Sequence, residues 1–443
     1  MLFHQFYLGC LAHASYLIGD GGEAAIVDPQ RDVDQYIDEA ARLGLRIRYI
    51  IETHLHADFV SGHRELAART GAQIVIGAEA NAEFPHVAAR DGGTLRVGSL
   101  LLRAIATPGH TPEGMSWLVV EDGRPRKLLT GDTLFIGDVG RPDLAGGRGF
   151  TPESMASMLY DSLHTKILTL PDDVEVFPAH GAGSACGKNI SKERSSTLGI
   201  QRRTNWALRP MPREEFVDLL TTDLAAAPAY FPYDAELNRR GVRALSEVTA
   251  PLLTADEVPP AATLLDVRDA ASFARNHAAG AINIGLGGQF ASWCGTLLSP
   301  SEPVVVIGET EAQTEEAVMR LARVGFENVV GRITDDAANE LPRASMEQIT
   351  VEELHARGGN VLDVRNAGEF ADGHVPSALP IPLAQLPQRL AELPDAPFAV
   401  ICAGGYRSSI AASLLARAGH EGIADVIGGT SAWVKSGLPV ANG

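Results

Sequence analysis

The sequence Thr-His-Leu-His-Ala-Asp-Phe-Val-Ser-Gly-His occupies residues 53–63, and it decides how the first half of the chain is interpreted. It follows an apolar run, residues 47–51, that reads as a buried strand, and a helix-like segment begins at Arg64. Three of the 13 histidines in the 443-residue chain fall within this stretch. Histidines two residues apart, followed by an aspartate, can direct imidazole nitrogens and a carboxylate into one pocket at a strand end. The stretch therefore predicts a metal site.

Three later loops carry a histidine or an aspartate directly after an apolar, strand-like run. Residues 107–111 read Thr-Pro-Gly-His-Thr, and their Pro-Gly pair forces a turn that presents His110. Residues 130–135 present Asp132, and residues 177–181 present His180. Strands that first form hairpins and then alternate with helices indicate a layered α/β arrangement with loops meeting at one edge. We expect these side chains to join the 53–63 stretch in one site.

In this order the motifs resemble those of the metallo-β-lactamase superfamily, whose fold is a four-layer αββα sandwich. The resemblance covers residues 1–243. It implies a metal site of His54, His110 and Asp132, with three further polar residues close to it: His56, Asp58 and His180. The usual motif of the family is His-x-His-x-Asp-His, and Phe59 stands where its last histidine belongs. Since phenylalanine cannot coordinate a metal, the resemblance predicts one metal ion per chain.

Two histidines and one carboxylate with open positions are typical of non-haem Fe(II) oxygenases, so we expect one Fe(II). Hydrolysis by a metal pair would need the second site. Within the superfamily the sequence is similar to persulfide dioxygenases, including their Gly-Arg-x-Asp segment at residues 140–143. The resemblance implies that Arg141 anchors a carboxylate of the substrate. An ion pair with Asp143 or Asp138 is the alternative for Arg141.

The segment after His180 bears on the carrier thiol of the substrate. Residues 181–187 read Gly-Ala-Gly-Ser-Ala-Cys-Gly, whereas glutathione-using relatives place a tyrosine there. The carrier therefore stays open between glutathione, coenzyme A and other thiols. Cys186 is either a second thiol that meets the substrate near the iron or a small buried residue.

The second half of the chain contains an internal repeat. Residues 264–284 match residues 361–381 at 10 of 21 positions. Each copy continues with an apolar strand, a turn and a helix, and this alternation is typical of a parallel α/β domain. We expect two such domains of about 100 residues, at 244–340 and 341–443.

The second copy carries a candidate nucleophile. Residues 402–409 read Cys-Ala-Gly-Gly-Tyr-Arg-Ser-Ser between a strand and a helix. Backbone N–H groups at a helix start favour a thiolate at Cys402, Arg407 adds positive charge, and Gly404 and Gly405 leave room for an anionic substrate. The loop is similar to the Cys-x-x-Gly-x-Arg loop of rhodaneses, which implies that Cys402 and Arg407 catalyse sulfur transfer. The first copy has Gly308 in place of the cysteine and resembles an inactive rhodanese.

The composition of the chain limits the binding partners and the cellular compartment that we expect for it. The net charge of −18 argues against nucleic acid or an anionic membrane surface as the main partner. No apolar run approaches the ~20 residues that span a bilayer. Four widely spaced cysteines indicate a reducing compartment rather than a disulfide framework. We expect a cytoplasmic homo-oligomer.

Together these features resemble persulfide dioxygenase–rhodanese fusions across nearly the whole chain. We expect an enzyme of sulfide detoxification that oxidises a low-molecular-weight persulfide with O2 to sulfite and thiol. We expect Cys402 to move sulfane sulfur between persulfide and sulfite or thiosulfate. One alternative is a two-metal thioester hydrolase of glyoxalase II type fused to a sulfurtransferase. Another is a non-enzymatic carrier of sulfane sulfur.

Overall fold

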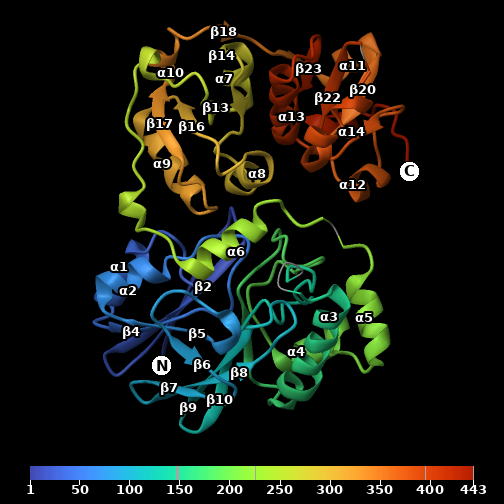
Figure 1. The fold of residues 1–443 in the computed structure, drawn as a ribbon. Coiled ribbons are helices and arrows are strands. Elements are labelled where there is room, and N and C mark those ends of the chain that lie inside the picture. The colour runs from blue at the N-terminus through green and yellow to red at the C-terminus, as the bar shows by residue number, and fades with distance from the viewer. Residues whose placement is uncertain (146–148, 225, 395, 443) are drawn as a thin grey trace. The chain divides into compact units, whose positions relative to one another are not determined.

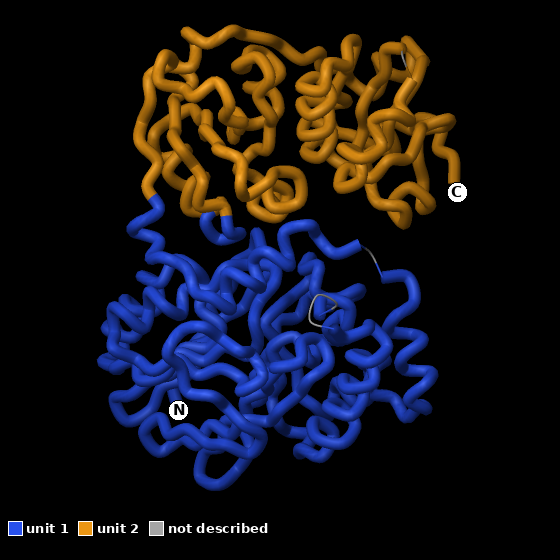
Figure 2. The backbone as a smooth tube through the Cα atoms, viewed as in Figure 1, with its two compact units in different colours: residues 1–248, 322–325 blue, residues 249–321, 326–443 orange. Residues whose placement is uncertain are grey.

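The computed structural model describes residues 1–145, 149–224, 226–394 and 396–442. The chain forms two compact units, one of residues 1–248 and 322–325, the other of residues 249–321 and 326–443 (Figure 2). The predicted domain limits at 243/244 and 340/341 stay predictions. Within the described part of the chain, no helix combines the length and the apolar character needed to cross a membrane.

The first unit is built on two six-stranded sheets that face each other (Figure 1). The first sheet has the order β1-β2-β3-β4-β5-β6 and the second the order β12-β11-β10-β9-β8-β7. The strands of the first sheet are Leu2–Leu8, His13–Asp20, Glu23–Val27, Arg46–Ile51, Gln73–Gly77 and Val87–Ala89. Those of the second, β7 to β12, are Thr94–Val97, Leu100–Ala106, Met115–Glu121, Arg124–Gly131, Glu175–Pro178 and Ser196–Thr197.

Neighbouring side chains of a strand point to opposite faces of the sheet, and this alternation builds the layers of the unit. Ile51 of β4 lies in the core between the sheets with Trp117 of β9, whereas its neighbour Ile50 lies in the core under the helices with Tyr36. Helices α1 (Asp34–Arg42) and α2 (His63–Thr70) cover the first sheet. Helices α3 (Pro152–Asp161), α4 (Leu198–Thr204) and α5 (Arg213–Thr221) cover the second, and α6 spans Phe231–Arg240. The predicted αββα sandwich is confirmed.

The second unit contains one parallel sheet per copy of the repeat. The first copy has the order β15-β13-β16-β17 and the second β19-β23-β22-β20-β21. The first sheet consists of β13 (Thr263–Asp266), β15 (Ile282–Asn283), β16 (Val304–Gly308) and β17 (Val329–Thr334). The second consists of β19 (Glu347–Ile349), β20 (Asn360–Asp363), β21 (Leu379–Pro380), β22 (Phe398–Ile401) and β23 (Ile423–Val426). A short pair, β14 (His277–Ala278) and β18 (Arg343–Ala344), completes the strands.

Helices flank both sheets. In the first copy they are α7 (Ala270–Arg275), α8 (Phe290–Leu297), α9 (Glu311–Ala322) and α10 (Asp335–Ala338). In the second they are α11 (Val351–Arg357), α12 (Ala367–Ala371), α13 (Tyr406–Arg417) and α14 (Gly429–Lys435). The prediction of two small parallel α/β domains is confirmed.

Candidate metal centre

Three buried side chains converge at the carboxyl ends of strands in the first unit. His54 follows β4, His110 follows β8, and Asp132 follows β10. His110 Nε2 lies 3.3 Å and His54 Nε2 3.9 Å from Asp132 Oδ2. One ligand atom from each of the three lies within 4.8 Å of the others. The structure thus brings together the three residues for which the sequence predicts direct coordination.

The hydrogen bonding of this group fits a metal ion. His54 Nε2 and both carboxylate oxygens of Asp132 are buried and have no hydrogen-bond partner among the described residues. Buried polar atoms are rarely left without a partner, and an ion would satisfy all of these. Separations of 3.3 and 3.9 Å also suit ligand atoms that each lie about 2.0–2.2 Å from one ion. The donor set is therefore suited to a divalent metal.

Outer contacts orient the two imidazoles. His110 Nδ1 lies 2.8 Å from the Arg141 carbonyl, and His54 Nδ1 lies 3.0 Å from Thr53 Oγ1. An Nδ1–H that donates to these oxygens leaves each Nε2 free for the ion. The Thr53 hydroxyl and backbone N–H both donate to Asp28, at 2.9 and 2.7 Å. Asp28 therefore fixes the start of the histidine stretch.

A second group lies beside the first, and its His180 also faces Asp132. His180 Nε2 is 3.3 Å from Asp58 Oδ2 and 3.7 Å from Asp132 Oδ1. His56, Asp58 and His180 offer ligand atoms within 4.8 Å of one another. Burial lowers the pKa of His180, but the carboxylates of Asp132 and Asp58 outweigh it and raise the pKa to about 10. The two carboxylates therefore favour the protonated form of His180.

His56 is anchored on its far side. Its Nε2 lies 3.1 Å from Asp28 Oδ1 and 3.5 Å from Glu52 Oε2. Burial lowers the pKa of His56, and these two carboxylates raise it to about 9. Glu52 also accepts a hydrogen bond from the Ser61 hydroxyl and lies 3.2 Å from His63 Nδ1. Sequence reasoning missed Asp28, which the pairing of β3 with β4 brings to the site, and Glu52, which stands four residues before His56.

Sequence reasoning also missed His13, a wholly buried residue at the start of β2. Its ring centroid lies 4.1 Å from that of Phe59, 5.5 Å from that of His180 and 5.8 Å from that of His56. Neither of its ring nitrogens has a hydrogen-bond partner in the part of the chain described. Burial, together with His180 and His56, holds the pKa of His13 well below its usual value. No motif in the sequence singles it out.

Arg141 and Cys186 both lie near the site. The Arg141 guanidinium makes two hydrogen bonds to the Asp143 carboxylate, at 2.6 and 2.7 Å, and another to the Ala185 carbonyl. This is the ion pair weighed as the alternative for Arg141, and anchoring of substrate stays a prediction. Cys186 offers its sulfur within 4.8 Å of ligand atoms of Asp132 and His180. Burial, and then Asp58 and Asp132, raises the pKa of Cys186 well above its usual value, so the free thiol is neutral at pH 7.

A cavity of about 470 Å³ opens beside the histidine loops. Its walls include Leu55 and Ala57 from the His54 loop and Thr111 from the His110 loop. Helix α6 contributes Glu236 and Arg239, which pair with each other.

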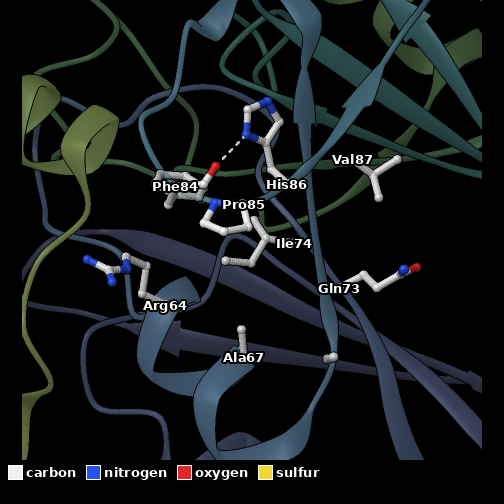
Figure 3. Close-up of a pocket in the computed structure, with 9 residues that line it drawn as sticks. Arg64, Ala67, Gln73, Ile74, Phe84, Pro85, His86 and Val87 are labelled. Carbon is white, nitrogen blue, oxygen red and sulfur yellow. Dashed lines mark hydrogen bonds between the residues drawn. The ribbon is translucent and has the colours of Figure 1, made fainter.

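A cavity of similar size, about 460 Å³, lies at the edge of the first sheet between α2 and β6 (Figure 3). Arg64, Phe84 and His86 are among its lining residues, and His86 Nδ1 lies 2.8 Å from the Phe84 carbonyl. None of its lining residues belongs to the His, Cys, Asp and Glu groups found among the described residues.

The second copy presents Cys402 at the start of α13. The side chain is buried, its sulfur accepts a hydrogen bond from the Gly405 N–H at 3.1 Å, and Ser408 Oγ lies 3.6 Å away. Arg407 makes two hydrogen bonds of 2.7 Å to the Glu369 carboxylate, so its charge is partly neutralised. Around Gly404 a Cβ would meet no atom within 4 Å, so this side of the loop is open.

The matching loop of the first copy is closed. A Cβ on Gly308 would lie 2.9 Å from Thr314 Cγ2 and 3.0 Å from Gln313 Oε1. The same Gln313 oxygen accepts a hydrogen bond from the Glu309 N–H at 2.6 Å. The Gln313 side-chain amide thus lies against the position that a side chain at residue 308 would occupy. The first copy cannot present a thiol at this point.

Comparison with known proteins agrees with this geometry. The sequence profile of the metallo-beta-lactamase superfamily matches residues 8–180, and that of the rhodanese-like domain matches residues 249–334 and 348–436. A probable metallo-hydrolase of Burkholderia pseudomallei is 33% identical over 248 residues, which cover 47% of this chain and 81% of the relative. The mitochondrial persulfide dioxygenase of Homo sapiens is 34% identical over 204 residues, which cover 44% of this chain and 74% of the relative.

Among solved structures, a metallo-beta-lactamase from Staphylococcus aureus superposes with a TM-score of 0.70. It is 33% identical and covers 75% of this chain and 99% of its own. The chain belongs to the metallo-beta-lactamase superfamily. It consists of a metallo-β-lactamase domain with persulfide dioxygenase homologues, followed by two rhodanese-like domains.

Proposed function

We propose that the chain is an Fe(II)-dependent persulfide dioxygenase joined to a thiosulfate sulfurtransferase. The observation that carries the proposal is the buried set His54, His110 and Asp132, together with Phe59 at the place of a family ligand. The 34% identity to a persulfide dioxygenase over most of that relative supports it. The overall reaction at this site is RSSH + O2 + H2O → RSH + sulfite + 2 H⁺, in which sulfur is oxidised and O2 is reduced.

Bound Fe(II) would supply the electron-transfer chemistry that lets O2 react with a thiol-bound sulfur. The protein supplies position and exclusion of water. The cavity lined by Leu55 and Ala57 holds the carrier of the persulfide, and its terminal sulfur reaches toward the three ligands. His110 is kept in one orientation by the Arg141 carbonyl, so its Nε2 faces the site throughout.

The rhodanese-like loop moves sulfur without a metal. The Cys402 thiolate attacks the outer sulfur of a persulfide, and the S–S bond breaks to release the carrier thiol after it takes a proton. The resulting Cys402 persulfide anion is stabilised by the Gly405 N–H. Sulfite then attacks the outer sulfur of this persulfide, which releases thiosulfate and restores the thiolate. Both sites belong to one chain, which keeps sulfite at a high effective concentration.

Asp132→Ala tests the metal centre. Removal of a carboxylate that faces both histidines should lower the affinity for iron by more than about tenfold and abolish sulfite formation. Sulfur transfer from thiosulfate should persist, because Cys402 lies in the other unit. Bound iron is measured by elemental analysis and sulfite by derivatisation. A normal sulfite yield from the variant would refute the ligand assignment.

Cys402→Ser tests the transfer site. Without a nucleophilic sulfur the sulfite should accumulate, so the product changes from thiosulfate to sulfite while oxygen uptake continues. The two products are separated by ion chromatography in the presence of excess persulfide. Unchanged thiosulfate output would show that sulfur is transferred elsewhere.

A second candidate is a two-metal thioester hydrolase fused to a sulfurtransferase. It is favoured by the second ligand group, whose His180 faces the Asp132 oxygen that the first group does not use, and by the metallo-hydrolase relative. This activity would need two metal ions, tolerate zinc and require no oxygen. Anaerobic hydrolysis of thioesters by the zinc-loaded chain distinguishes it from the dioxygenase.

A further inference from the structure

We infer that the inactive rhodanese copy is a positioning element of the sulfurtransferase site, acting through Tyr406 and Asn283 on the first turns of α13. The inference rests on the proposed transfer of sulfur at Cys402. Both copies lie in the same compact unit (Figure 2), and α13 starts directly after the loop that holds the sulfur.

Tyr406 belongs to the active loop, yet its side chain is held by the other copy. Its hydroxyl donates to the Gly285 carbonyl at 2.9 Å. A Cβ on Gly288 would lie 3.4 Å from the Tyr406 ring, an ordinary van der Waals distance, so the ring lies against this glycine-containing turn. Tyr406 immediately follows Gly405, whose N–H donates to the Cys402 sulfur. Movement of the phenol would therefore move the donor.

Asn283 makes a second connection one turn further along α13. Its Oδ1 accepts from the Ser409 hydroxyl at 2.6 Å, and its backbone N–H donates to Ser413 Oγ at 2.9 Å. Its Nδ2 donates to the carbonyls of Asp266 and Arg268, at 3.1 and 3.0 Å. These carbonyls belong to the strand-end turn of the inactive copy. Asn283 thus ties that turn to the helix whose amino terminus faces the sulfur.

The burial of these contacts indicates that they fix the position of α13 and do more than pack the two copies together. Asn283, Ser409 and Ser413 are all buried, so their hydrogen bonds are shielded from water and specify one arrangement. The catalytic effect of an N–H donor depends on its being fixed before charge develops on the acceptor.

The far end of α13 offers a matched control. Arg417 donates to the Gly280 carbonyl at 2.9 Å and to Thr263 Oγ1 at 3.2 Å, so it joins the same two copies. It lies eleven residues beyond Tyr406, about 16 Å along the helix. Loss of either contact weakens the interface, but only loss of the Tyr406 contact should disturb the Gly405 N–H.

The test compares Tyr406→Phe, Arg417→Ala and Cys402→Ser in the full chain, with thiosulfate as sulfur donor. Tyr406→Phe keeps the ring and should fold. We expect its kcat to fall about fivefold, with a smaller change in KM, because a donor that acts on the developing charge is misplaced. Arg417→Ala should keep the wild-type kcat, even if its Tm falls as far as the Tm of Tyr406→Phe. Oxygen uptake at the iron site should be unchanged in both.

A wild-type kcat in Tyr406→Phe would overturn the inference, and so would an equal loss of kcat in Arg417→Ala. Cys402→Ser separates this failure from failure of the proposed function. If Cys402→Ser loses transfer while Tyr406→Phe does not, only the positioning role is wrong. If Cys402→Ser transfers sulfur normally, the transfer site itself is wrong.

Discussion

At the scale of single residues, Phe59 has the greatest consequence for the chemistry. It is 1% exposed, and its ring packs against the imidazoles of His13 and His56. A hydrocarbon ring offers no lone pair, so the place where the family has a metal ligand contributes only packing. His56, Asp58 and His180 nevertheless remain grouped. One substitution therefore separates a chain expected to hold one metal ion from one expected to hold two.

Phe59→His should restore the second site. The new imidazole would stand beside His56 and Asp58, and we expect bound metal to rise from about one to about two ions per chain. Phe59→Leu removes the same ring without adding a ligand and should leave the metal content unchanged. Elemental analysis of dialysed protein measures both. Equal metal content in the wild type and Phe59→His would contradict this account of Phe59.

At the scale of elements, both candidate sites lie where strands end and helices begin. The three proposed metal ligands follow β4, β8 and β10, and His180 of the neighbouring group follows β11. Cys402 follows β22 in the same way, and the Gly405 N–H at the start of α13 reaches its sulfur. Gly405 adopts φ 101°, a conformation that side chains with a Cβ rarely take.

Gly405→Ala should therefore slow sulfur transfer. An alanine there would cost about 1–2 kcal/mol or would turn the N–H away from the sulfur. Gly419, just past the end of α13, has φ 91°, and Gly419→Ala carries the same strain away from the sulfur. Both variants should lose similar Tm in thermal unfolding, but only Gly405→Ala should lose transfer rate. A wild-type rate in Gly405→Ala would show that the loop geometry is not needed.

At the scale of the whole molecule, two units with different chemistry are joined in one chain. The first holds the three proposed metal ligands, and the second holds Cys402, the proposed nucleophile. Each is built by an independent core, so a substitution in one site should leave the other active. Because both sites belong to one chain, we expect the intact chain to release thiosulfate rather than free sulfite.

The sequence predicted those residues of each site that belong to local motifs. His54, His110 and Asp132 each follow a recognisable strand, and Cys402 precedes a glycine pair and an arginine, so their grouping could be expected. His13 and Asp28 could not be assigned, because strand pairing across the sheet brings them to the site, whereas Glu52 directly precedes the histidine stretch. The Tyr406–Gly285 contact depends on packing between two copies of the repeat, which no local pattern encodes.

The most direct test of the central claim is oxygen uptake by the iron-loaded chain with a panel of persulfides. Glutathione, coenzyme A and cysteine persulfides would each be supplied, with sulfite and thiosulfate measured alongside. The account predicts that O2 is consumed mole for mole with the sulfur oxidised, and that the best substrate identifies the carrier. Bound iron with no uptake for any persulfide would contradict it and favour the thioester hydrolase.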